Sequence, residues 1–188
     1  MSVKPPTSPP ERRAPVRVGS LVLVNTGHGK GKSTAAFGTM IRALARGWHV
    51  CVIQFIKSGK WKVGEEEIGR RLGVDWWTIG DGFTWNSKVM EETEARAREA
   101  WRTAKEKVAS GKYEMVLLDE ITYPINYGWL DVHEVVDAIR NRPEHVNVIA
   151  TGRDAPPELI EVADTVTEMT KIKHAFDRGV RAKRGIDL

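Results

Sequence analysis

The chain of 188 residues contains one cysteine and no apolar run approaching the ~20 residues that a membrane-spanning helix needs. A single cysteine excludes an internal disulfide, and Cys51 stands inside an apolar run, so we expect it to be a buried structural thiol. The N-terminal stretch also lacks the apolar segment of a secretion signal. These absences predict a cytoplasmic protein that does not insert into a membrane.

Two catalytic patterns are missing as well. The sequence shows no clear Ser/His/Asp set and no Cys/His cluster with metal-ligand spacing, and its five histidines are scattered along the chain. Because no protein nucleophile is evident, the attacking group of any transfer reaction would belong to a second substrate.

Charge is only mildly unbalanced, with 29 Lys and Arg against 25 Asp and Glu and a formal net charge of +4. Much of the positive excess lies in the first 17 residues and in residues 171–184, without a tight basic run interleaved with aromatic residues. This charge pattern permits nucleic-acid binding but does not favour it.

The length suits a single domain preceded by a short arm. Residues 1–18 contain five prolines and almost no large apolar side chains, a composition that cannot bury enough surface to fold alone. We therefore predict a flexible proline-rich N-terminal arm at 1–18 and one domain at 19–188. The arm either folds over a ligand or a partner subunit or is a plain disordered tail.

A glycine-rich loop between an apolar run and a helix is the central motif. The run at 21–24 leads through Gly27, Gly29 and Gly31 into an amphipathic helix that begins at Lys32. Such a loop directs backbone N–H groups and the positive end of the helix dipole at an anion. We expect Lys32 to contact phosphates and the Ser33 hydroxyl to ligate a bridging Mg²⁺.

The loop departs from the strict Walker A pattern at one position, where Thr26 replaces glycine. A flexible turn is the alternative, but the strand before the loop and the helix after it favour phosphate binding. Among the five histidines, only His28, which lies in this loop, is expected to be close to the reacting groups. The residues predicted to hold ATP are Thr26, Gly27, His28, Gly29, Lys30, Gly31, Lys32, Ser33 and Thr34.

The rest of the chain alternates between apolar strands and helices. Continuous apolar strands are typical of a parallel sheet covered on both faces, so we predict an α/β fold with ligands at the carboxyl ends of the strands. A capping-box contact between Asp131 and Glu134 is expected where one helix begins. Besides the strand before the loop, strands are predicted at 48–56, 74–79, 113–120, 145–151 and 164–169, and helices from 32, at 65–72, at 90–108, from 131 and after 154.

Polar and aromatic residues follow several of these strands. Asp119 and Glu120 end one strand in the manner of a Walker B segment, and alternation along the strand implies that only one of them meets the metal directly. Arg153 either neutralises phosphate or is an exposed loop charge. Phe83 and Trp85 lie on a glycine-hinged loop, where the alternative to ligand contact is a hydrophobic plug.

Several ordered motifs resemble the ATP:cob(I)alamin (corrinoid) adenosyltransferases of the CobA/CobO/BtuR type. The resemblance runs from about residue 19 to the end, and that family tolerates threonine at position 26 and commonly has asparagine at position 28. The motifs lie at 26–38, 54–57, 82–85, 118–123, 149–153, 173–180 and 185–187.

The resemblance implies a RecA-like P-loop NTPase fold, with a mostly parallel sheet and helices on both faces, and usually a homodimer. It implies binding of MgATP and a corrinoid, attack of Co(I) on C5′ of ATP and release of triphosphate, with an electron-donating flavoprotein as a further partner. Catalytic roles would fall to Lys32, Glu120 and Arg153, metal binding to Ser33 and Glu120 with Asp119 as the other candidate, and contact with the lower corrin face to Phe83 and Trp85.

Two rival functions are compatible with the same loop. A small-molecule kinase or NTPase would release ADP, whereas an adenosyltransferase would not. A non-catalytic or nucleic-acid-binding RecA-like module would bind DNA with strong salt dependence and would have no affinity for corrinoids.

Overall fold

A computed structural model describes residues 14–55, 64–79 and 87–187 of the chain. Its centre is one six-stranded sheet in the order β3-β2-β4-β5-β1-β6, and every recorded strand pair is parallel. The predicted parallel α/β sheet is therefore confirmed. The strands are β1 (Val22–Thr26), β2 (Val50–Phe55), β3 (Asp75–Ile79), β4 (Met115–Asp119), β5 (Asn147–Thr151) and β6 (Thr165–Glu168).

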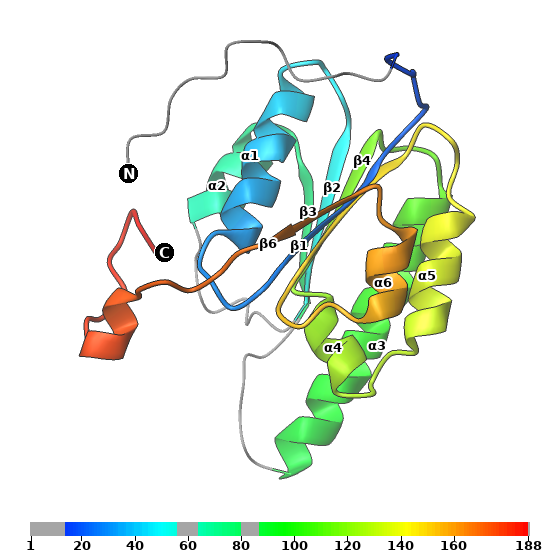
Figure 1. Ribbon diagram of the computed structural model, residues 1–188. Coiled ribbons are helices and arrows are strands. Elements are labelled where there is room, and N and C mark those ends of the chain that lie inside the picture. Colours follow the sequence, from blue (N-terminus) through cyan, green and yellow to red (C-terminus); the bar gives the residue numbers. More distant parts are fainter. Residues whose placement is uncertain (1–13, 56–63, 80–86, 188) are drawn as a thin grey trace, which may run out of the picture.

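Helices cover both faces of the sheet, as Figure 1 shows. On one face lie α1 (Lys32–Leu44) and α2 (Gly64–Arg71). The opposite face carries α3 (Ser87–Ala109), α4 (Thr122–Asn126), α5 (Val132–Arg140) and α6 (Pro157–Val162). After β6 the tail leaves the sheet and forms the 3₁₀ helix η1 (Ala175–Arg178).

The core consists of two apolar clusters, one on each face. One lies under α1 and includes Phe37 and Met40, and the other lies under α3 and α5 and includes Trp101 and Ile139. All six residues of β2 are buried, which explains its unbroken apolar sequence. Cys51 in this strand is fully buried, and desolvation raises the pKa of its thiol, as expected for a structural cysteine.

Strand order brings the predicted motifs to one edge of the sheet. Strand β5 lies between β1, which leads into the phosphate loop, and β4, which ends in the acidic pair. The carboxyl ends of parallel strands share an edge, so the segments that follow β1, β4 and β5 become neighbours. This arrangement is a mostly parallel α/β sheet of the P-loop NTPase kind, which the family resemblance implied.

One local expectation was wrong, and one short helix was not predicted. The capping box does not form, because Asp131 accepts a hydrogen bond from the His133 N–H (2.9 Å) and Glu134 accepts one from Lys105 Nζ of α3 (2.9 Å). Helix α4 was not predicted, since five residues containing Pro124 are too few for a periodic pattern.

Some predicted features lie outside the described residues. These are the first 13 residues of the arm and the loop that carries Phe83 and Trp85. Residues 14–18, at the end of the arm, are exposed coil. Within the described ranges, no helix combines the length and the hydropathy needed to cross a bilayer.

Candidate active site

The phosphate loop joins β1 to α1 through residues 27–31. Gly27 (φ 92°) and Gly31 (φ 119°) have positive φ, which favours glycine, and Gly31 is the N-cap of α1. No side chain caps this helix, so its first N–H groups point into the loop and are suited to an anion. The predicted strand, loop and helix are confirmed.

Lys32 is folded into this loop. Its Nζ donates hydrogen bonds to the carbonyl oxygens of Gly27 and Gly29, both at 2.8 Å, and the residue is 8% exposed. Desolvation lowers the pKa of Lys32, while Glu120 acts to raise it and Arg153 to lower it. The charges of Glu120 and Arg153, the other two predicted catalytic residues, therefore both act on Lys32.

Two loop glycines are required by packing against the chain that follows β6. The Gly29 N–H donates to the Met169 carbonyl, and a Cβ atom at either Gly27 or Gly29 would lie 2.6 Å from that oxygen. A side chain at either position would displace this segment. These glycines thus have a structural role in addition to the predicted contact with phosphate.

The threonine at the Walker A glycine position also has a structural partner. Thr26 Oγ1 accepts a hydrogen bond from the Ala155 N–H at 3.0 Å, and His28 Nε2 lies 3.0 Å from Asp154 Oδ1. Both contacts connect the phosphate loop to the turn after β5. A glycine at position 26 would lose one of them, which gives the departure from the strict motif a physical reason.

Asp119 is fully buried and hydrogen-bonded on both carboxylate oxygens. Gln54 Nε2 donates to Oδ2 (2.9 Å) and Thr151 Oγ1 donates to Oδ1 (2.8 Å). The sequence analysis identified neither partner of Asp119. Gln54 could have been noticed, because it is a polar residue inside an apolar strand. Its Oε1 in turn accepts from the Trp76 Nε1–H at 3.0 Å, so the polar group is satisfied within the core.

Glu120 differs from Asp119 for a reason other than the expected alternation along a strand. Strand β4 ends at Asp119, and Glu120 has φ 64°, in the left-handed region that only a few per cent of non-glycine residues adopt. Its N–H donates to Thr151 Oγ1 at 3.0 Å. The expectation that the strand includes Glu120 was therefore wrong, because the strand ends at Asp119 and the chain turns at Glu120.

The turn after β5 places Arg153 at the same edge. Gly152 has φ 144°, its N–H donates to the Asn25 carbonyl (3.2 Å), and an added Cβ atom would lie 2.0 Å from Thr122 Oγ1. Arg153 itself is exposed. A small residue at position 152 is thus needed for α4 and the turn to pack together.

The other predicted residues have mixed surroundings. Lys30 is exposed, and its Nζ lies 2.6 Å from Asp187 Oδ1 in the C-terminal tail. Ser33 is half-buried at the start of α1, whereas Thr34 is exposed. Phe83 and Trp85 lie outside the described residues, so their predicted corrinoid contact is untested.

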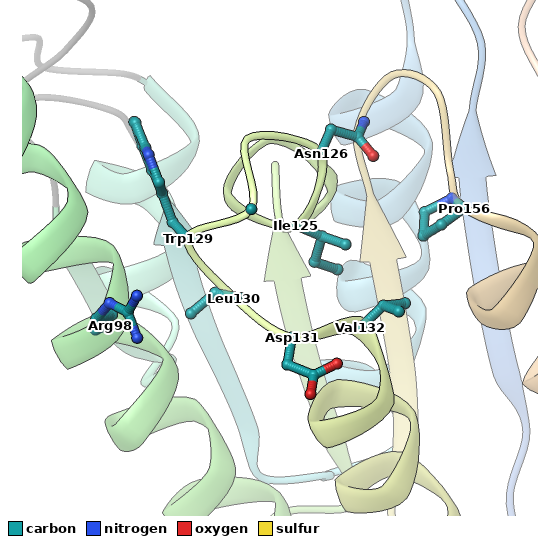
Figure 2. Close-up of a pocket in the computed structure, with 9 residues that line it drawn as sticks. Arg98, Ile125, Asn126, Trp129, Leu130, Asp131, Val132 and Pro156 are labelled. Atoms are coloured by element: carbon teal, nitrogen blue, oxygen red, sulfur yellow. The ribbon is translucent and has the colours of Figure 1, made fainter.

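A pocket of about 500 Å³ opens beside the Arg153 turn. In Figure 2 the Asn126 side chain points toward the chain that follows β5, while Arg98 and Trp129 lie across the pocket. None of the sequence-predicted site residues is among those that line it. The lining residues are Arg98, Ile125, Asn126, Gly128, Trp129, Leu130, Asp131, Val132 and Pro156.

The donor groups in the site suit a hard cation held mainly by a substrate. Among the described residues, no group of three or more His, Cys, Asp or Glu side chains could hold a metal ion. Ser33 and Glu120 offer a hydroxyl and a carboxylate at the loop edge, and Mg²⁺ commonly takes one or two such ligands together with phosphates and waters. These residues therefore fit Mg²⁺ bound with a nucleotide.

Comparison with known proteins identifies relatives along most of the chain. Corrinoid adenosyltransferase from Escherichia coli (strain K12) is 47% identical over 167 residues, which cover 89% of this chain and 85% of the relative. Corrinoid adenosyltransferase CobA from Salmonella typhimurium is 44% identical with the same coverage. Among solved structures, EssC (ATPases 2 and 3) from Geobacillus thermodenitrificans matches with a TM-score of 0.49 and 14% identity, covering 90% of this chain and 36% of that chain.

The family described as ATP:corrinoid adenosyltransferase BtuR/CobO/CobP matches residues 19–188. This range includes the phosphate loop, the acidic turn after β4 and the arginine turn after β5. The resemblance carried by the separate motifs is thereby confirmed over residues 19–188. The chain belongs to the ATP:corrinoid adenosyltransferase family.

Proposed function

We propose that the protein transfers the 5′-deoxyadenosyl group of ATP to the Co(I) centre of cobalamin or a related corrinoid and releases triphosphate. The observation that carries the proposal is the position of Lys32 inside the phosphate loop, coupled electrostatically to Glu120 and Arg153, in a chain of this family. A P-loop kinase or NTPase is not favoured by the family match.

Lys32 would exchange partners when ATP binds. In the structure its ammonium group is satisfied by the carbonyl oxygens of Gly27 and Gly29. A triphosphate in the loop offers charged oxygens, which bind an ammonium more strongly than neutral carbonyls do. On ATP binding, the Lys32 ammonium would therefore exchange its two carbonyl acceptors for charged phosphate oxygens.

Ser33 and Glu120 would hold Mg²⁺ together with the phosphates. When bound, the ion neutralises part of the negative charge of the triphosphate. Asp119 would act through its own hydrogen bonds, since both of its carboxylate oxygens already accept from buried donors. Its expected effect is to keep the end of β4 in place.

The transfer step needs no protein nucleophile. Co(I) of the corrinoid substrate supplies the electron pair for the new Co–C5′ bond, and the C5′–O bond breaks with its electrons remaining on the triphosphate oxygen. Charge develops on this leaving group, so Lys32 and Arg153 are suited to stabilise it. The absence of an evident Ser/His/Asp set in the sequence agrees with this chemistry.

Three further parts of the proposal rest on the family resemblance. Phe83 and Trp85 would contact the lower face of the corrin ring and help to displace the lower cobalt ligand. An electron-donating flavoprotein would reduce the cobalt to Co(I). Two copies of the chain would form a homodimer.

Product analysis tests the proposal. Protein, ATP, Mg²⁺ and chemically reduced cobalamin should yield a light-sensitive adenosylated corrinoid and one triphosphate per turnover. Omission of the corrinoid should abolish triphosphate formation. Release of ADP, with no adenosylated corrinoid, would contradict the proposal and indicate a kinase or NTPase.

A further inference from the structure

The turn that carries Arg153 has a backbone that needs external support. Gly152 (φ 144°) and Asp154 (φ 52°) both have positive φ, and Asp154 is one of two described non-glycine residues with this property. Such conformations persist when surrounding contacts hold them. The direction of the intervening Arg153 side chain therefore depends on what fixes the two flanking residues.

Asn126 supplies such a contact from α4. Its Nδ2 donates to the Arg153 carbonyl at 3.3 Å and to the Asp154 carbonyl at 3.0 Å. Figure 2 shows this side chain pointing from the end of α4 toward the chain after β5. One amide thus holds two consecutive carbonyl groups of the turn.

Helix α4, which carries Asn126, is packed against the core. Ile125 is 8% exposed and belongs to the larger core cluster, and Thr122 at the start of α4 is fully buried. The backbone of Asn126 is therefore held by the packing of α4, although its side chain is exposed.

The opposite side of the turn is attached to the phosphate loop. Thr26 holds the Ala155 N–H, and His28 lies against the Asp154 carboxylate. The turn is thus held between α4 and the loop in which Lys32 lies. Burial lowers the pKa of Lys32, and the positive charge of Arg153 acts in the same direction.

We propose that Asn126 is a positioning residue for ATP binding, which holds the Arg153–Asp154 backbone so that the Arg153 side chain stays at the edge of the sheet that carries the phosphate loop. The proposal rests on the proposed function, in which Arg153 contacts phosphate. Asn126 itself touches no substrate in this account. The alternative is that the amide only stabilises the fold.

A double-mutant cycle separates the two possibilities. Calorimetry would give the MgATP dissociation constant of the full-length protein and of Asn126→Ala, Arg153→Ala and the double variant. We expect Asn126→Ala to weaken binding about fivefold, since each ordinary hydrogen bond accounts for roughly two- to tenfold. Arg153→Ala should weaken it by at least about tenfold, and adding Asn126→Ala to that variant should change little.

Two further variants complete the design. Asn126→Asp keeps the size of the side chain but removes the donor, so its effect in the Arg153 protein should be at least that of alanine. Asn141→Ala is a matched control, because Asn141 Nδ2 donates to the Asp137 carbonyl (2.8 Å) at the end of α5. We expect this control to bind MgATP like the unaltered protein.

The outcomes are distinguishable. Equal weakening by Asn126→Ala in the presence and absence of Arg153, or no weakening in either, would overturn the positioning role. If Arg153→Ala leaves MgATP binding unchanged, both the phosphate contact of Arg153 and the positioning role are wrong. Adenosylation of the corrinoid by that variant would still uphold the proposed activity.

Discussion

At the residue scale, Lys32 is held in a nearly buried position by two carbonyl groups of its own loop. We predict that Lys32→Ala weakens MgATP binding and lowers turnover together. A hydrogen bond to a charged group is worth about 1.5–3 kcal/mol, or roughly 10- to 150-fold in affinity. Calorimetric titration with MgATP measures the change.

Lys105→Ala provides the control for loss of a lysine, because Lys105 pairs with Glu134 on the exposed surface of α3 and α5. This control should bind MgATP normally. Full activity in a folded Lys32→Ala protein would remove this lysine from the site.

The two acids after β4 should respond differently to loss of charge. Glu120→Gln is expected to raise the Mg²⁺ concentration needed for half-maximal activity more than Asp119→Asn does, because both oxygens of Asp119 already accept from protein donors. A Mg²⁺ titration of both variants measures this. The reverse order would transfer the metal-binding role to Asp119.

Asp119→Asn should instead lower stability. One oxygen of the buried carboxylate becomes an NH₂ group that faces a donor, from either Gln54 or Thr151. A buried donor without an acceptor costs about 1–3 kcal/mol, which corresponds to a fall in Tm of roughly 2–12 °C for a chain of this size. Thermal unfolding measures the shift, and an unchanged Tm would contradict the role assigned to this network.

At the element scale, glycines in α1 and in the turn after β5 should respond in opposite ways to an added methyl group. Gly38 lies in the interior of α1 with no heavy atom within 4 Å of an added Cβ. We predict that Gly38→Ala raises the free energy of unfolding by about 0.5–1 kcal/mol, because alanine loses less conformational freedom in a helix. Thermal unfolding should show a higher Tm.

Gly152→Ala should act in the opposite direction. Its Cβ atom would lie 2.0 Å from Thr122 Oγ1, at a φ of 144° that L-residues rarely adopt. The turn and α4 would have to separate, so we expect a lower Tm and weaker MgATP binding through displaced Arg153. A Tm equal to that of the unaltered protein would contradict this packing.

The aromatic loop between β3 and α3 is the element predicted to act on the corrinoid. Replacing both Phe83 and Trp85 with alanine should leave MgATP binding nearly intact. The rate from Co(II) with a weak reductant should fall sharply, because the cobalt would keep its lower ligand, whereas pre-reduced Co(I) should restore most of the activity. Equal losses from both substrates together with a lower Tm would show that the pair is structural packing.

At the scale of the whole molecule, the resemblance to the family predicts a homodimer. One chain has a mass of 21.1 kDa, so light scattering coupled to gel filtration should give twice this value, about 42 kDa. A mass of 21.1 kDa at micromolar concentration would contradict the prediction.

The site is assembled from segments that are far apart in the chain. The hydrogen bond from Ala155 to Thr26 joins residues 129 positions apart, and the contact of Gln54 with Asp119 joins residues 65 apart. The first contact depends on β5 lying beside β1, and the second on β2 lying beside β4. A change that disturbs this order would affect the phosphate loop and both turns together.

Much of the architecture follows from local sequence. Apolar runs predicted the strands, the helix predicted at 90–108 corresponds to α3, and glycines marked the phosphate loop. The signals act over a few residues, so they can be read without knowing what packs against them. The short α4 escaped prediction because five residues are too few for a periodic pattern, and the partner of Glu134 escaped it because that partner comes from another helix.

The sequence by itself determined the alternation of strands and helices, the loop that can cradle phosphate, and the family, because each is written in contiguous residues or in motifs of fixed order. Only the tertiary structure decided which side chains support the site. Thr26 meets Ala155, Gln54 meets Asp119 and Asn126 meets the Arg153 turn because strand order and the packing of α4 bring them together. Hydrogen bonds have a range of about 3 Å, so no local pattern can specify partners that the chain separates by dozens of residues.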